Sequence, residues 1–291
     1  MLALIRGNSS IVSLWSRPGA VLCLGVYVFL QLAGSVFPYP TKFQDNLTPR
    51  QRAIEKQRLR LGSSDLEERR DAVARLGVMD HPDASRVALS ALKDPEPIVR
   101  ATAAKAILAL PGDESVEALI TLLSDRDEFV RQESAYALAK TRSGAAVSPL
   151  SAALTDKKDG VRAAAALALG EIGDESAVVT LVQVVSGQPV TGGGKGKRKG
   201  QKEQNQFVLR AAAMALGQIR SRAAVPALIG ALGQEQLASD VKREAARSLG
   251  LIGDPASVPA LQTALSSTDP YLSQAASEAL KSIERARQVR R

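Results

Sequence analysis

The chain has few of the residues on which most active sites depend. Its 291 residues include one cysteine, Cys23, and one histidine, His81. The cysteine lies inside an apolar run near the N-terminus, which excludes disulfides and cysteine catalysis from the rest of the chain. The histidine lies in the turn sequence His-Pro-Asp, where a surface position is the ordinary expectation. We therefore predict no catalytic residue, no metal site and no cofactor.

Aromatic residues are also scarce, at 3% of the sequence. Beyond residue 45 there are only four, namely Phe129, Tyr136, Phe207 and Tyr271. A core without aromatic residues must be aliphatic, and the chain offers no aromatic box for a ring-shaped ligand or for stacked bases.

What the sequence does contain is a repeat. Val99-Arg100, Val130-Arg131 and Val161-Arg162 follow one another at a spacing of 31 residues. An Ala-rich stretch follows each pair, and the equivalent positions later in the chain are spaced by 47, 33 and 31 residues. A period of this length is typical of a solenoid, whose units are too small to bury their own apolar faces and are stable only when stacked.

Each unit has the pattern of a helical hairpin. In residues 156 to 186, Val161, Ala165 and Leu169 recur at helical spacing, and Gly173 is expected to end this helix. Asp174 is expected to cap a second helix. Asp94-Pro95 has the same start signal, since proline is tolerated at the first helical position. The sequence therefore predicts an all-α solenoid of stacked hairpins.

Segments such as DPEPIVRATAAKAILAL and DKKDGVRAAAALALGEIGDESAVVTL resemble HEAT repeats of the short bacterial type, which also occur in phycobilin lyases. The resemblance implies an inter-repeat ladder, in which an Asp in the turn before the Val-Arg helix acts with an Arg six positions later. The matching positions are Asp94 with Arg100, Asp125 with Arg131, and Asp156 with Arg162. Arg69 and Lys242 fit the basic column less well, and Leu209 breaks it, with Arg210 displaced by one place. Charge-assisted bonds to a neighbouring unit's turn would give these arginines a structural role.

These patterns divide the chain into three parts. We expect a signal peptide or membrane anchor at 1–41, a linker with a basic capping helix at 42–63, and the solenoid at 64–291. The predicted repeats are 64–93, 94–124, 125–155, 156–186, 203–235 and 236–266, with a partial repeat at 267–284 and a flexible basic insertion at 187–204.

The N-terminal segment is apolar. No charged residue occurs from Pro18 to Thr41, a length close to the roughly 20 apolar residues that a spanning helix needs. We predict a membrane-associated protein with a single N-terminal span through residues 18–41. The alternative is a cleaved signal peptide, with processing before Val36 and an exported product. The helix expected near residues 49 to 62 would cap the first repeat or, alternatively, rest on anionic headgroups.

Charge is distributed unevenly along the chain. Residues 65 to 184 carry 14 Lys and Arg against 20 Asp and Glu, whereas both ends are basic. A nucleic-acid-binding superhelix should carry a continuous basic stripe, so we do not expect a nucleic-acid partner. The basic insertion concentrates five cations in a glycine-rich stretch, where they would suit electrostatic contact with an anionic partner. These cations are Lys195, Lys197, Arg198, Lys199 and Lys202.

The sequence therefore favours a noncatalytic protein-binding scaffold that is membrane-tethered or exported. Two alternatives remain open: a phycobilin-lyase-like accessory factor, and an electrostatic binder of anionic membrane or nucleic acid that acts through the basic insertion. The partner protein is not identified by any motif.

Overall fold

The computed structural model describes residues 47–111, 113–190 and 205–289. The chain divides into two units, Met1–Pro49 and Arg50–Arg291, and nearly all described residues belong to the second. The predicted anchor at 1–41 and the five cations of the basic insertion lie outside the described residues. No helix of the described part is long and apolar enough to cross a membrane.

The described residues form helices joined by turns, with no strand, as predicted. Successive units each contribute a longer first helix and a shorter second helix. The first helices are α3 (Leu66–Val78), α5 (Pro97–Ala106), α7 (Glu128–Thr141), α9 (Asp159–Ile172), α11 (Gln206–Ile219), α13 (Ser239–Ile252) and α15 (Pro270–Val289). The second helices are α4 (Pro82–Ala88), α6 (Glu114–Leu122), α8 (Val147–Ala153), α10 (Val178–Val185), α12 (Val225–Gly233) and α14 (Val258–Ala264).

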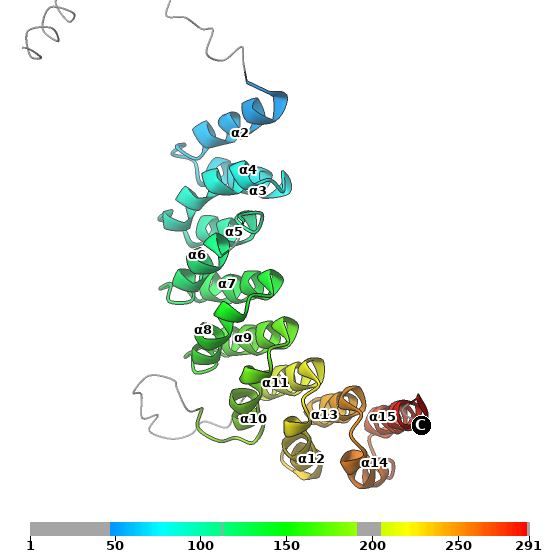
Figure 1. Ribbon diagram of the computed structural model, residues 1–291. Coiled ribbons are helices and arrows are strands. Elements are labelled where there is room, and N and C mark those ends of the chain that lie inside the picture. Colours follow the sequence, from blue (N-terminus) through cyan, green and yellow to red (C-terminus); the bar gives the residue numbers. More distant parts are fainter. Residues whose placement is uncertain (1–46, 112, 191–204, 290–291) are drawn as a thin grey trace, which may run out of the picture. The chain divides into compact units, whose positions relative to one another are not determined.

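The two kinds of helix form two layers of the solenoid. Each first helix packs against the first helix of the next unit, from α3 through α15 (Figure 1). Each second helix from α6 onward packs against the first helix of the following unit, whereas α4 contacts both α3 and α5. The contact between α9 and α11 is as extensive as the others although the basic insertion separates them in the sequence. The insertion therefore does not interrupt the stack.

Short 3-10 helices modify the predicted turns. They are η3 (Leu89–Lys93), η4 (Gly144–Ala146), η5 (Glu175–Ala177), η6 (Arg222–Ala224) and η7 (Pro255–Ser257). Asp174 accepts a hydrogen bond from the Ser176 N–H, so it caps η5, which then leads into α10. The start predicted at Asp94-Pro95 was two residues early: α5 begins at Pro97, because the Asp94 carboxylate is used in the turn and in a contact with the preceding unit.

Most first helices end on a residue in the left-handed conformation. Gly173 and Gly253 have φ of 78° and 70°, as the sequence predicted for a helix stop at Gly173. The equivalent residues of α7 and α11 are Arg142 and Arg220, with φ of 50° and 59°. A side chain with a Cβ is strained in this conformation by roughly 1–2 kcal/mol, so these two arginines are held there by the surrounding turn.

The core is aliphatic, and small residues determine how closely the first helices approach. From α3 to α13, the same position of each unit carries a fully buried leucine or isoleucine, as in Leu138, Leu169 and Leu216. A Cβ on Gly170 would lie 2.6 Å from the Cα of Ala215, and one on Gly217 would lie 2.8 Å from the Cα of Ser248. Real side chains do not tolerate such distances, so glycine is required where these helices touch.

The helix predicted before the first repeat is α2 (Pro49–Arg60). Ile54 of α2 is buried in the common core, and Arg60 forms ion pairs with Glu68 and Asp71 of α3, at 3.2 and 2.6 Å. α2 therefore covers the open side of the first hairpin, as a capping helix must.

Candidate binding face

The buried charges of the solenoid form a ladder between successive turns. Arg100 donates from Nε and Nη2 to the two carboxylate oxygens of Asp125, both at 2.8 Å, and Arg131 contacts Asp156 in the same way at 2.8 and 3.0 Å. Arg69 makes the equivalent bidentate contact with Asp94, at 2.8 and 3.1 Å. In each pair the two residues are 25 positions apart, so each pair joins neighbouring units.

The Asp and Arg that lie six positions apart in one unit also meet, but through the backbone carbonyl of the aspartate and not through its carboxylate. The Nη1 atom of Arg100 donates to the backbone carbonyl of Asp94 at 2.8 Å, and that of Arg131 donates to the carbonyl of Asp125 at 2.9 Å. The carboxylate of each aspartate instead faces the arginine of the preceding unit. Each arginine thus holds its own turn and the next one, which fixes the register of the stack.

The ladder is interrupted at the basic insertion. Arg162 still donates to the carbonyl of Asp156, but its second partner is Asp159 of its own helix. Asn205, at the start of α11, donates to the other carboxylate oxygen of Asp159 at 2.5 Å. This hydrogen bond connects α9 to α11 where the ladder is interrupted. Beyond the insertion the ladder resumes with Arg243 and Asp269, at 2.8 Å, and Lys242 is not the pairing residue. After the insertion the arginine lies one residue later in the unit than Arg131 does in its own unit, at Arg243 and already at Arg210. This one-residue shift in the sequence indicates the change of pairing residue.

Burial and hydrogen bonding compete in setting the pKa of the ladder carboxylates. Burial raises the pKa of Asp94 and Asp125, while hydrogen bonds from Arg69 and Arg100, and from backbone N–H groups, lower it. The hydrogen bonds prevail, and both pKa values lie below the ordinary value of aspartate. For Asp269 the hydrogen bond from Arg243 is the main cause of a lowered pKa. These three carboxylates are thus ionised partners of arginines and are unsuited to acid-base chemistry at neutral pH.

The exposed apolar side chains gather on the layer of first helices. Six of the nine large apolar residues that are exposed in the described part lie on first helices. In most units the start of the first helix carries a buried valine, such as Val130, Val208 or Val241. The exposed residues lie one residue before this position, or six or ten residues after it. These three positions fall on one side of a helix. We call this surface the first-helix face and define it by these six residues: Val78, Phe129, Phe207, Met214, Leu251 and Tyr271.

Three of the four aromatic residues beyond residue 45 belong to this face, and two of them lie beneath an arginine. The guanidinium of Arg210 lies 5.6 Å from the ring centroid of Phe207, on the same helix. That of Arg243 lies 5.1 Å from the ring of Tyr271, in the next unit. Such cation-π contacts present a flat apolar ring and a charged donor side by side.

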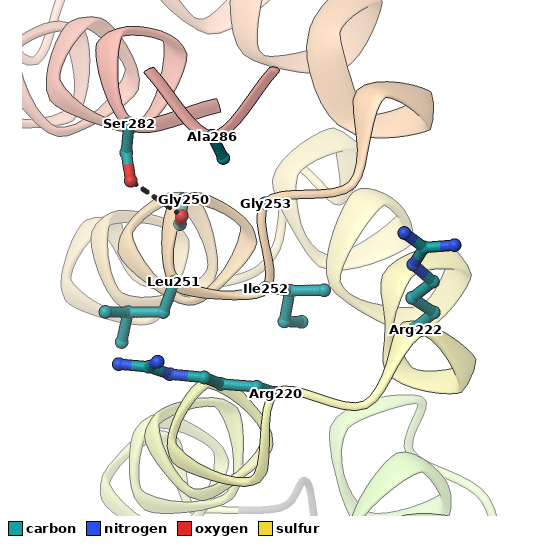
Figure 2. Close-up of a pocket in the computed structure, with 8 residues that line it drawn as sticks. All are labelled: Arg220, Arg222, Gly250, Leu251, Ile252, Gly253, Ser282 and Ala286. Atoms are coloured by element: carbon teal, nitrogen blue, oxygen red, sulfur yellow. Dashed lines mark hydrogen bonds between the residues drawn. The ribbon is translucent and has the colours of Figure 1, made fainter. Parts of the chain in front are cut away.

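A cavity of about 350 Å³ lies at the C-terminal end of α13. Figure 2 shows Arg220 beneath Leu251, and Arg222 at the right of the view, beside Ile252. The Ser282 hydroxyl donates a hydrogen bond to the Gly250 carbonyl at 3.0 Å. The carbonyl end of α13 faces this space and carries partial negative charge, so the arginines complement the helix dipole there.

His81 caps α4 and accepts a hydrogen bond from the Asp83 N–H through Nδ1 at 3.2 Å. Within residues 47–111, 113–190 and 205–289, no group of three His, Cys, Asp or Glu residues could hold a metal ion.

Solved structures with a similar fold cover most of the chain. YibA of Escherichia coli aligns with a TM-score of 0.55 and 17% identity, over 97% of this chain and all (100%) of that one. The complex of CpcE and CpcF of phycocyanin lyase from Nostoc sp. PCC7120 aligns at 0.45 and 24%, over 84% and 91% of the two chains. Human deoxyhypusine hydroxylase aligns at 0.39 and 23%, over 80% and 84%. Identities this low concern the fold alone.

No curated protein matches the chain by sequence. A sequence profile for HEAT repeats does match, over residues 55–139, 116–190 and 201–281. These ranges cover well over half of the chain and coincide with the stacked hairpins. The chain therefore belongs to the family of HEAT-repeat proteins.

Proposed function

We propose that this protein is a noncatalytic scaffold that binds a partner protein on the first-helix face. The observation that carries the proposal is the gathering of exposed apolar side chains from separate units on one layer of the solenoid. Leu251, Phe207 and Tyr271 are 48%, 43% and 64% exposed. Exposed apolar and aromatic side chains that share one surface are typical of a protein-binding site, whereas scattered single ones need no explanation.

The buried arginines of the ladder support a scaffold role, because they connect neighbouring units. The buried arginines Arg100 and Arg131 are engaged on three sides by groups of the turns that they join. Their role is to register the units, and a stack of registered units displays an extended surface rather than an enclosed site.

A membrane location is part of the proposal and rests on the sequence alone. The uncharged segment at 18–41 would tether the solenoid to a membrane or, if cleaved, export it. The intact mass of the protein purified from its native source decides between the two: retention of residues 1–41 supports the tether, and a chain beginning near residue 36 supports export.

Photocrosslinking from defined positions tests the binding face. A photoreactive residue in place of Phe129, Met214 or Leu251 should form adducts with the partner in the native cell. A photoreactive residue in place of Val179, an exposed residue of α10 in the second layer, is the matched control. Adducts at Val179 and none at the three first-helix positions would contradict the proposal, as would a bilin absorbance that copurifies with the protein.

A further inference from the structure

The exposed side of α11 differs in charge from the rest of the first-helix face. It presents Phe207, Arg210, Met214 and Gln218, spaced by three, four and four residues and thus on one side of the helix. We call these four residues the α11 strip. From Gln206 to Ile219 the helix contains no acidic residue, so the strip has no carboxylate of its own.

Among the described residues, the cations at the strip have no carboxylate partner. Arg210 lies over the Phe207 ring and forms no ion pair, and Arg220 at the end of α11 forms none either. The nearby acids of α9 are occupied: Glu171 binds Lys140 at 2.8 Å, and Asp159 binds Arg162 and Asn205. Arg210 and Arg220 are therefore available to a carboxylate from another molecule.

α13 extends this surface on the other side. It packs directly against α11 and contributes Arg247, which is half-exposed and only loosely paired with Glu244 at 3.5 Å. Leu251, one helical turn further along α13, lies over the Arg220 side chain in Figure 2. Two packed helices thus carry three guanidinium groups together with exposed apolar side chains: Arg210 lies over Phe207, Arg220 lies beside Leu251, and Arg247 lies one turn before Leu251 on α13.

We propose that the α11 strip, with Arg220, Arg247 and Leu251, binds an acidic segment of the partner protein that also carries apolar side chains. This inference rests on the proposed scaffold function and names the chemistry of the partner. Arginines surrounding apolar side chains complement a segment in which carboxylates alternate with leucine-like residues.

The spacing of the arginines limits the length of the segment. Arg210 and Arg220 are ten residues apart on a helix, which is about 15 Å along its axis. An extended chain covers this distance in roughly four or five residues. The carboxylates of the bound segment should therefore be four or five residues apart, with apolar side chains between and beside them.

A synthetic peptide tests this geometry on the full-length protein. The probe is a fluorescein-labelled nonapeptide in which two glutamates, four residues apart, alternate with leucine and serine. We expect saturable binding by fluorescence anisotropy, weakened about tenfold by Arg210→Glu or Arg220→Glu, because a contact with each arginine is replaced by repulsion. Raising the salt concentration from about 50 to about 300 mM should also weaken it, since the contacts are exposed to solvent.

The controls separate this site from general charge. Arg86→Glu places the same charge change on α4, in the second layer, where Arg86 is exposed and pairs with Asp83 at 3.4 Å. We expect this variant to bind like the wild type, and a peptide with lysine in place of glutamate not to bind. Circular dichroism of Arg210→Glu and Arg220→Glu should be unchanged, because both side chains are exposed.

Several results would overturn the inference: no saturable binding, equal binding of the lysine peptide, an equal loss with Arg86→Glu, or complete displacement of the peptide by a DNA oligonucleotide. If the peptide fails while photoreactive Phe129 variants still capture the partner, the scaffold function stands and the assignment of an acidic partner segment at α11 is wrong. If the peptide binds as expected but no first-helix position captures a partner, the scaffold proposal fails instead.

Discussion

Arg100 and Asp125 are 25 residues apart in the sequence and form a bidentate ion pair with both bonds at 2.8 Å. The remaining nitrogen of Arg100 donates to the Asp94 carbonyl, so one side chain fixes two successive turns. Its side chain is only 6% exposed, and that of Asp125 only 10%. A charge-assisted contact this well buried is expected to matter for stability, unlike a surface ion pair.

Replacing Arg100 should therefore destabilise the stack. We expect Arg100→Leu to lower the free energy of unfolding by about 3 kcal/mol, because Asp125 is left buried without its cation. Urea titration monitored by circular dichroism measures the change. Arg86→Leu, at an exposed arginine of α4, should stay within about 0.5 kcal/mol of the wild type, and equal effects of the two substitutions would show that the ladder contributes nothing.

The ladder also predicts acid sensitivity. The pKa values of Asp94, Asp125 and Asp269 are lowered in the folded state. Their stabilising contribution is complete above the unfolded pKa of aspartate, about 3.9, and is lost as the pH falls through the still lower folded values. We expect the free energy of unfolding to fall from about pH 5 downward, and to fall less steeply in Asp125→Asn. A profile identical in the two proteins would argue against this origin.

Glycine at the contact between α11 and α13 is a second requirement for stacking. Gly217→Ala should lower the free energy of unfolding by about 2 kcal/mol, since its Cβ would meet the Ser248 backbone at 2.8 Å and push the helices apart. Gly230 of α12 is the matched control, because nothing lies within 4 Å of its Cβ direction. Gly230→Ala should stabilise the protein by up to about 1 kcal/mol through helix propensity. Equal destabilisation by both would refute close approach as the cause.

The left-handed helix ends allow a change in the opposite direction. Arg142→Gly should raise the thermal midpoint, because glycine adopts the φ of 50° without strain and the gain is about 0.5–1 kcal/mol. Gly173→Ala, at the same position of the next unit, should lower it by a similar amount. Differential scanning calorimetry measures both, and a lower midpoint for Arg142→Gly would mean that the arginine makes a contact worth more than the strain.

The sequence predicted the repeating hairpin because the period places buried valine, leucine and small residues at fixed positions, and those positions require stacking. The resemblance implied a ladder between neighbouring units, but it named Asp125 with Arg131, whereas the Asp125 carboxylate pairs with Arg100 of the preceding unit. Linear spacing alone does not show which arginine a carboxylate faces. Lys242 fitted the basic column less well, and the pairing residue is its neighbour Arg243, because the register of the ladder shifts by one place after the insertion.

The α11 strip carries no sequence motif. Phe207, Arg210 and Met214 are ordinary residues of an Ala-rich helix, and their significance depends on which acids of α9 are already paired. Only the displacement of Arg210 from the basic column gave a sign that this helix differs from the others. Pairing across units is a property of the folded stack, so the site could not be read from one unit.

Binding of the partner protein by the first layer of helices is tested most directly with two double variants of the full-length protein, compared for retention of the native partner after affinity purification. Phe207→Ser with Leu251→Ser alters the first-helix face, and Val179→Ser with Leu265→Ser removes exposed apolar residues outside it. We predict loss of the partner with the first pair and retention with the second; retention with the first pair and loss with the second would contradict the account.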